Sequence, residues 1–359
     1  MAKRLLLLNG IAIAGIVLHH AAAYALQAMF EWTDRYLPVA VPNYDQLGSL
    51  PYYGLMVVRL LMTAAVPAFF FVSGYFVAFM ARGGRSRVTL NMVTPRIKVL
   101  LIPFLIWTAL RYVLLRRLPT SLDDILNPYH FIPLLIQFYL LAPLMVDLAR
   151  RDWKLLLAPA ALFQLVGPVI RVLSALLTGA PLQEELLDLP RWLFLVGHPF
   201  WFPFGIVAGL YLSEARSWLA RQRKALLAAV ILLGGLVLAE YWLVDAANGQ
   251  EWLGPGFSGI AHHLFSFALI LYVLALEPAA VPLSRHFSQL GTQTLGIYLM
   301  NIPAVYVAAV LMYRLTPALL GYQLVYFALL VLVGLGVPLL LMRAVRRSPA
   351  RVGYRYLFG

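Results

Sequence analysis

The chain contains no cysteine and few charged residues, and both shortages narrow what it can be. Without cysteine there is no disulfide, no thiolate nucleophile and no Cys-based metal site. Only 12% of the 359 residues are charged, whereas 62% are hydrophobic. Soluble domains carry about 25% charged residues, so this chain has too little polar surface to face water on all sides. The composition therefore predicts an integral membrane protein.

Long apolar segments recur along the whole chain, and each can cross a hydrocarbon core of about 30 Å. The connections between them are too short to hold a soluble domain, so we expect one domain over residues 1–359. We predict an all-α, polytopic membrane helical bundle with about ten transmembrane helices. Their approximate bounds are Leu5–Ala28, Tyr53–Met80, Arg96–Leu115, Tyr129–Leu148, Leu155–Leu177, Trp192–Tyr211, Ala225–Asp245, Phe257–Leu276, Leu290–Met312 and Leu320–Met342.

Basic and acidic residues separate between the two sets of connections. If the N-terminus is cytoplasmic, the inner connections hold most lysines and arginines, and the outer ones hold most acids, such as Asp34 and Glu184. This asymmetry orients helices during insertion and predicts that both termini are cytoplasmic. It also accounts for the net charge of +13. We therefore expect the lipid bilayer as a partner, no nucleic acid, and a multi-pass location in the inner or plasma membrane.

Ionisable side chains inside the predicted spans fall at one depth, in the outer part of the bilayer. Such residues are rare in membranes, face the bundle interior or a wet cavity, and usually mark function. Adjacent helical residues point about 100° apart, so one histidine of the first pair can face a cavity while the other braces it. The residues of this layer are His19, His20, Arg59, Arg171, His198, Glu240, His262 and His263.

Each member of this layer also has a plainer explanation. Arg59, Arg171 and Glu240 suit snorkelling or structural ion pairs, and an intramembrane histidine often serves as a hydrogen-bonded packing residue. The histidines lack an i, i+4 His pair and the HExxH spacing, so we expect no metal site.

Two features lie near the predicted cytoplasmic surface. Ser73 and Gly74 form a small-residue notch that another helix or a slender ligand could approach. Arg82, Arg85 and Arg87 flank two glycines in the next loop, where backbone and guanidinium groups can wrap an anion such as phosphate. Positive-inside charge on a flexible loop explains the same arginines without a ligand. Gly205 and Gly209 make a GxxxG pair, which indicates helix packing.

Several motifs, taken in order, resemble the membrane acyltransferase-3 family over nearly the full chain. Two positions depart from the family pattern: Asn9 stands where the family has arginine, and Asn301 where it has histidine. The segments that carry the resemblance are Asn9-Gly10-Ile11-Ala12 followed by His20, Phe70-Phe71-Val72-Ser73-Gly74-Tyr75, Arg82-Gly83-Gly84-Arg85 and Ile297-Tyr298-Leu299-Met300-Asn301.

The resemblance implies an acyltransferase for groups other than amino-acyl groups. It would transfer an acyl group, commonly acetyl, from cytoplasmic acyl-CoA to a hydroxyl of a glycan or lipid-linked acceptor on the outer side, as in O-acetylation of polysaccharides. His20, with His19 beside it, is then the expected catalytic residue, as general base or transient acyl acceptor. Arg82, Arg85, Arg87, Ser73 and Gly74 are expected at the acyl-CoA donor. The acceptor pocket is expected to include Arg59, His198, His262, His263 and Asn301.

Two other functions fit the same polar layer. A transporter or flippase of a glycan or lipid could use the outer cavity without chemistry, although the halves of the chain show no obvious inverted repeat. A membrane-embedded sensor could change conformation when histidines are protonated. Binding of acetyl-CoA distinguishes the enzyme from a transporter or flippase. A sensor would turn over no acyl donor, and its ligand response would follow pH near the ordinary pKa of histidine.

Overall fold

A computed structural model describes most of the chain, and its described residues form helices, turns and no strand, which confirms the all-α class. The described residues are 2–30, 48–81, 88–116, 118–178, 193, 198–212, 216–244 and 259–359.

The long helices follow the predicted apolar segments. Within the described residues, eight candidate spans are long and apolar enough to cross a membrane, and α8 and α11 are shorter apolar helices. The count of ten and the side of each terminus remain predictions. The main helices are α1 (Ala2–Phe30), α2 (Leu50–Met62), α3 (Ala65–Ala81), α4 (Leu90–Leu115), α6 (Phe131–Arg151), α7 (Trp153–Thr178), α8 (Trp201–Tyr211), α10 (Arg223–Val244), α11 (Ile260–Ala275), α13 (Thr294–Leu315) and α14 (Gln323–Arg347).

Short helices join or flank these spans. They are α5 (Leu122–Leu126), η1 (Asn127–Tyr129), α9 (Arg216–Arg221), η4 (Pro278–Ala280), α12 (Ser284–Gly291), η5 (Pro317–Gly321), η6 (Pro349–Gly353) and α15 (Tyr354–Phe358). The last of them returns to α4, where Trp107 donates a hydrogen bond from Nε1 to the carbonyl of Leu357 (2.9 Å).

The predicted span Tyr53–Met80 is divided into two helices, α2 and α3, by a turn at Thr63 and Ala64. Pro67 lies in the first turn of α3 and has no N–H to donate to the carbonyl of Thr63. The amide of Val66 donates to that carbonyl instead, at 3.2 Å, in the tighter i to i+3 pattern. The proline therefore accounts for the break.

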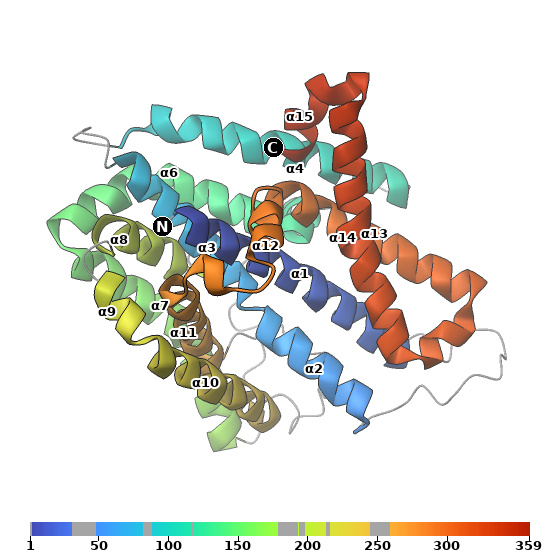
Figure 1. The fold of residues 1–359 in the computed structure, drawn as a ribbon, viewed down its shortest axis with the longest axis horizontal. Coiled ribbons are helices and arrows are strands. Elements are labelled where there is room, and N and C mark those ends of the chain that lie inside the picture. The colour runs from blue at the N-terminus through green and yellow to red at the C-terminus, as the bar shows by residue number, and fades with distance from the viewer. Residues whose placement is uncertain are drawn as a thin grey trace.

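Helix α1 lies at the centre of the bundle. It packs against α2, α3, α11, α12, α13 and α14 (Figure 1). Its N-terminal half is anchored by Arg4, a buried residue whose Nη1 donates to the carbonyl of Leu274 at the end of α11 (2.8 Å). Residues on α1 can therefore meet partners from several helices at once.

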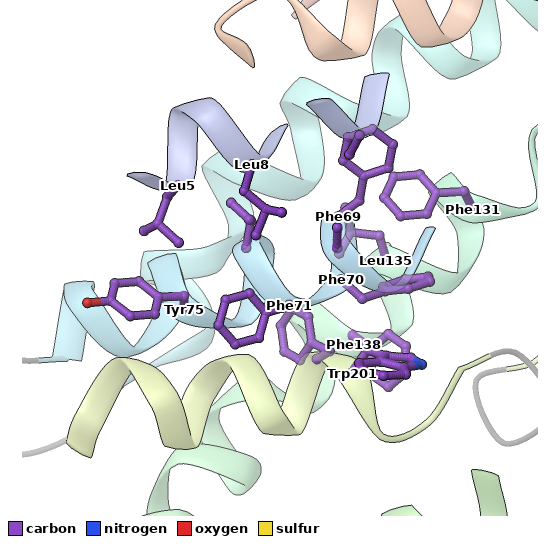
Figure 2. Close-up of a cluster of buried hydrophobic side chains, with 14 of the residues drawn as sticks. Leu5, Leu8, Phe69, Phe70, Phe71, Tyr75, Phe131, Leu135, Phe138 and Trp201 are labelled. Carbon is purple, nitrogen blue, oxygen red and sulfur yellow. The ribbon is translucent and has the colours of Figure 1, made fainter. Parts of the chain in front are cut away.

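An aromatic core fixes α3, α6 and α8 against one another (Figure 2). The rings of Phe70 and Phe131 lie 4.8 Å apart, and those of Phe138 and Phe202 stack at 5.1 Å. Such ring pairs stabilise a core beyond the area they bury.

Glycines bring α3 and α8 into close contact. A Cβ at Gly74 would collide with the carbonyl oxygen of Phe202, and a Cβ at Gly205 would collide with that of Phe71. Gly209 faces Ala78 in the same interface. The GxxxG pair therefore packs helices, as predicted.

Candidate functional site

His20 on α1 is hydrogen-bonded to Asn301 on α13. Nδ1 of His20 lies 2.6 Å from Oδ1 of Asn301, which is 0% exposed. The amide nitrogen of Asn301 donates to the carbonyls of Ile297 (3.0 Å) and Tyr298 (2.6 Å). Because carbonyls only accept, the amide can have just one orientation, and its oxygen must accept from His20. The neutral ring therefore carries its proton on Nδ1 and a lone pair on Nε2.

His19 instead braces α1 against α2. Its Nδ1 lies 2.9 Å from the carbonyl oxygen of Arg59, so Nδ1 is the donor. The two histidine rings are 5.5 Å apart and inclined at 66°. Of the adjacent pair, His19 thus donates a hydrogen bond to a backbone carbonyl, while His20 donates one to the side-chain oxygen of Asn301.

His262 ties α11 to the break between α2 and α3. Thr63 donates its hydroxyl hydrogen to the carbonyl of Leu60 (2.5 Å), so its oxygen accepts from Nε2 of His262 (2.7 Å). That leaves the lone pair of His262 on Nδ1. Within the described part of the chain, this buried Nδ1 has no hydrogen-bond partner.

His263 has the opposite tautomer and faces α7. The amide of Phe200 donates to Oε1 of Gln164 (3.4 Å), which orients the Gln164 amide nitrogen toward Nε2 of His263 (3.2 Å). Nε2 of His263 therefore accepts, and its proton is on Nδ1.

His198 precedes α8 in a strained backbone conformation. Its φ of 61° lies in the left-handed region, which non-glycine residues seldom adopt. Its ring lies 5.8 Å from that of Phe70 and 6.4 Å from that of His263. Strain of this kind tends to occur at functional sites, where the surrounding structure maintains it.

His130, at the start of α6, belongs to the same layer although the sequence analysis did not single it out. It interacts electrostatically with both His20 and His198. His130 is the second residue of the predicted span Tyr129–Leu148, so the depth argument places it nearer the outer surface than the other histidines, and only its interactions in the structure connect it with them. His130 connects the two halves of the layer, and Arg59 adds a positive charge that interacts with His19 and His20.

Glu240 has a structural role in the layer. Its two carboxylate oxygens accept the backbone amides of Ile260 and Ala261, each at 2.8 Å. A helix starting inside a membrane needs such acceptors for its first N–H groups. Gly259 leaves room for the carboxylate, since a Cβ there would collide with it. Glu240 therefore caps α11.

The residues predicted to hold the donor are only partly described. Arg82, Arg85 and Arg87 lie outside the described residues. Gly74 is buried against α8, so a helix fills that side of the notch. Ser73 is half-buried, and its hydroxyl hydrogen-bonds to Tyr139.

Two hollows accompany these elements. An open, mostly apolar groove of about 630 Å³ runs along α4 and α5, lined by Thr108, Tyr112, Arg116 and Ile125 among others. A cavity of about 10 Å³ lies between Thr63, Glu240 and His262, and is of the size that one water molecule needs. Among the described residues, no group of three or more His, Asp or Glu could hold a metal ion.

Comparison with known protein families gives a match over nearly the whole chain. A family model described as an acyltransferase domain matches residues 4–343. Neither the curated proteins nor the solved structures gave a match. The family match includes all the histidines of the layer, together with both positions, Asn9 and Asn301, that depart from the family pattern. Since it spans far more than half of the sequence, the chain belongs to the membrane acyltransferase-3 family.

Proposed function

We propose that this protein transfers an acyl group, typically acetyl, from acyl-CoA at the cytoplasmic face to a hydroxyl of a glycan or lipid-linked acceptor on the outer side of the plasma or inner membrane. Membership of the acyltransferase-3 family supports membrane acyl transfer. That the donor is acyl-CoA, that the group is acetyl and that the acceptor is a glycan or lipid-linked hydroxyl are our proposals beyond family membership.

The hydrogen bond from His20 to Asn301 carries the assignment of the general base. Asn301 fixes the neutral tautomer in which Nε2 has the lone pair. A base must have its lone pair directed to the proton it removes. Among the described histidines, His20 is the one whose tautomer is fixed by an amide that is itself held by two carbonyls.

The reaction then balances as follows. Nε2 of His20 accepts the proton of the acceptor hydroxyl, and the hydroxyl oxygen attacks the thioester carbonyl. The tetrahedral intermediate collapses with cleavage of the C–S bond, and the coenzyme A thiolate takes the proton back from Nε2. The products are an O-acyl ester and free coenzyme A. A two-step route, in which His20 carries the acyl group between donor and acceptor, uses the same nitrogen as nucleophile.

Neighbouring groups have supporting roles in the proposal. Arg59, which interacts with both His19 and His20, can stabilise the oxyanion of the tetrahedral intermediate. His198, His262 and His263 line the acceptor side of the layer. His19 holds α1 in position through the backbone of α2.

On the donor side, Arg82, Arg85 and Arg87 would bind the phosphates of acyl-CoA, and Ser73 would lie beside its pantetheine arm. Gly74 contributes through helix packing, because α8 covers it.

Two measurements on the purified full-length protein test this function. First, isothermal titration should detect binding of acetyl-CoA; a protein that does not bind it would fit a transporter better. Second, release of coenzyme A thiol in the presence of a saccharide panel should fall at least about 100-fold in His20→Ala, the lower range for loss of a general base. His286→Ala, an exposed histidine on α12, is the matched control. Unchanged turnover in His20→Ala would rule out the catalytic assignment.

A further inference from the structure

Arg111 on α4 has no role in the mechanism above, yet part of its guanidinium is buried. Nη1 of Arg111 is inaccessible to solvent, and among the described residues nothing accepts a hydrogen bond from it. Guanidinium donors removed from water are costly unless they are paired. An orphaned donor on a cation inside a membrane protein therefore calls for a partner.

Three tyrosines from different elements interact with this guanidinium. It interacts electrostatically with Tyr24 on α1 and Tyr129 in η1, and its carbon Cζ lies 5.5 Å from the ring centre of Tyr112. The Tyr24 ring in turn lies 6.3 Å from that of Tyr306 on α13. These neighbours offer hydroxyl groups and rings, which are neutral. Within the part of the chain that the structure describes, the positive charge of Arg111 is left for a ligand.

Two of these tyrosines connect Arg111 with the surroundings of His20. Tyr24 follows His20 by four residues, so both lie on one face of α1, about 5–6 Å apart along the helix. Tyr129 precedes His130, which interacts with His20. Arg111 therefore shares two neighbours with His20, and Tyr24 places it toward the end of α1 predicted to be the outer one.

We propose that Arg111 binds an anionic group of the acceptor, a phosphate or a carboxylate, while the acceptor hydroxyl faces Nε2 of His20. The inference rests on the proposed function, because it gives that reaction its acceptor class. Guanidinium binds both anions through paired N–H donors. An uncharged acceptor would leave the guanidinium unpaired, and a buried group left unpaired is an effective means of rejecting the wrong substrate.

The test measures binding of three sugar probes without any acyl donor. Full-length protein in phosphatidylcholine nanodiscs is titrated with glucose, glucuronate and glucose 1-phosphate at about 0.15 M salt, where long-range charge effects are screened. At least one anionic probe should bind the wild type with a Kd at least tenfold lower than glucose. Arg111→Gln should abolish that difference, and Arg111→Lys should keep part of it.

The matched control is Arg116→Gln, which removes the same charge at the exposed residue that caps the C-terminal end of α4. It should leave the anion preference unchanged. Equal or undetectable binding of all probes by the wild type, or an anion preference that survives Arg111→Gln, would overturn the proposal. So would an effect of Arg111→Gln seen only as altered binding to phosphatidylglycerol nanodiscs, since the arginine would then bind a lipid headgroup.

Failure of this inference is separable from failure of the proposed function. If the wild type turns over acetyl-CoA but shows no anion preference, only the role of Arg111 is wrong. If Arg111 gives an anion preference but acetyl-CoA neither binds nor reacts, the transferase assignment fails.

Discussion

Replacement of Asn301 by alanine tests the arrangement that orients His20. Nδ1 of His20 would lose its acceptor at 2.6 Å, and the ring could then move its proton to Nε2, the nitrogen that must accept one. A buried donor left without a partner costs about 1–3 kcal/mol. Each 1.36 kcal/mol added to a barrier slows the reaction about tenfold. We therefore expect kcat for coenzyme A release to fall on the order of 10- to 100-fold in Asn301→Ala.

A second variant separates orientation from packing. Asn301→Asp keeps an oxygen acceptor for His20 but loses both donors to the carbonyls of Ile297 and Tyr298. The Asn301→Asp protein should have a lower melting temperature than Asn301→Ala and yet a higher kcat. The control Gln293→Ala removes an amide whose hydrogen bond stays within its own turn, so turnover should not change. If Asn301→Ala retained wild-type kcat at a normal melting temperature, the reasoning about the tautomer would be refuted.

Two further predictions concern stability. Gly74→Ala should lower the free energy of unfolding by about 2 kcal/mol, because its Cβ would meet the Phe202 carbonyl and overpack the interface; Gly167→Ala, with nothing within 4 Å, is the control, and an equal Tm for both variants would contradict the packing argument. Glu240→Ala should cost about 1–3 kcal/mol by leaving two amides of α11 unpaired. Glu240→Gln should cost less and exposed Glu277→Gln almost nothing, so equal thermal shifts in all three would count against the cap.

The sequence predicts the helices well because a bilayer forces each apolar segment to satisfy its own backbone. Each of the ten predicted ranges overlaps a helix of the structure. The break at Thr63 escaped prediction because the segment around Pro67 is uniformly apolar. The depth of the histidines could also be estimated, since depth follows from position along a helix.

The partners of those histidines could not be derived in this way. His20 and Asn301 are 281 positions apart, and their contact depends on α1 lying beside α13. The place of Asn301 in an acceptor pocket stays a prediction, and the structure adds its hydrogen bond to His20, which the sequence did not indicate. Glu240 looked like a member of the ionisable layer because a capping carboxylate has no sequence signature when it comes from another helix.

The break between α2 and α3 affects histidines on two other helices, α1 and α11. In an unbroken helix the carbonyl of Arg59 would accept the amide of Thr63. At the break that amide is directed to the carbonyl of Leu61, so the Arg59 oxygen is left to accept from His19. The carbonyl of Leu60 likewise accepts a hydrogen bond from the Thr63 hydroxyl, whose oxygen then accepts one from Nε2 of His262. A single imino acid, Pro67, thereby sets which nitrogen is protonated on two imidazoles, one in α1 and one in α11.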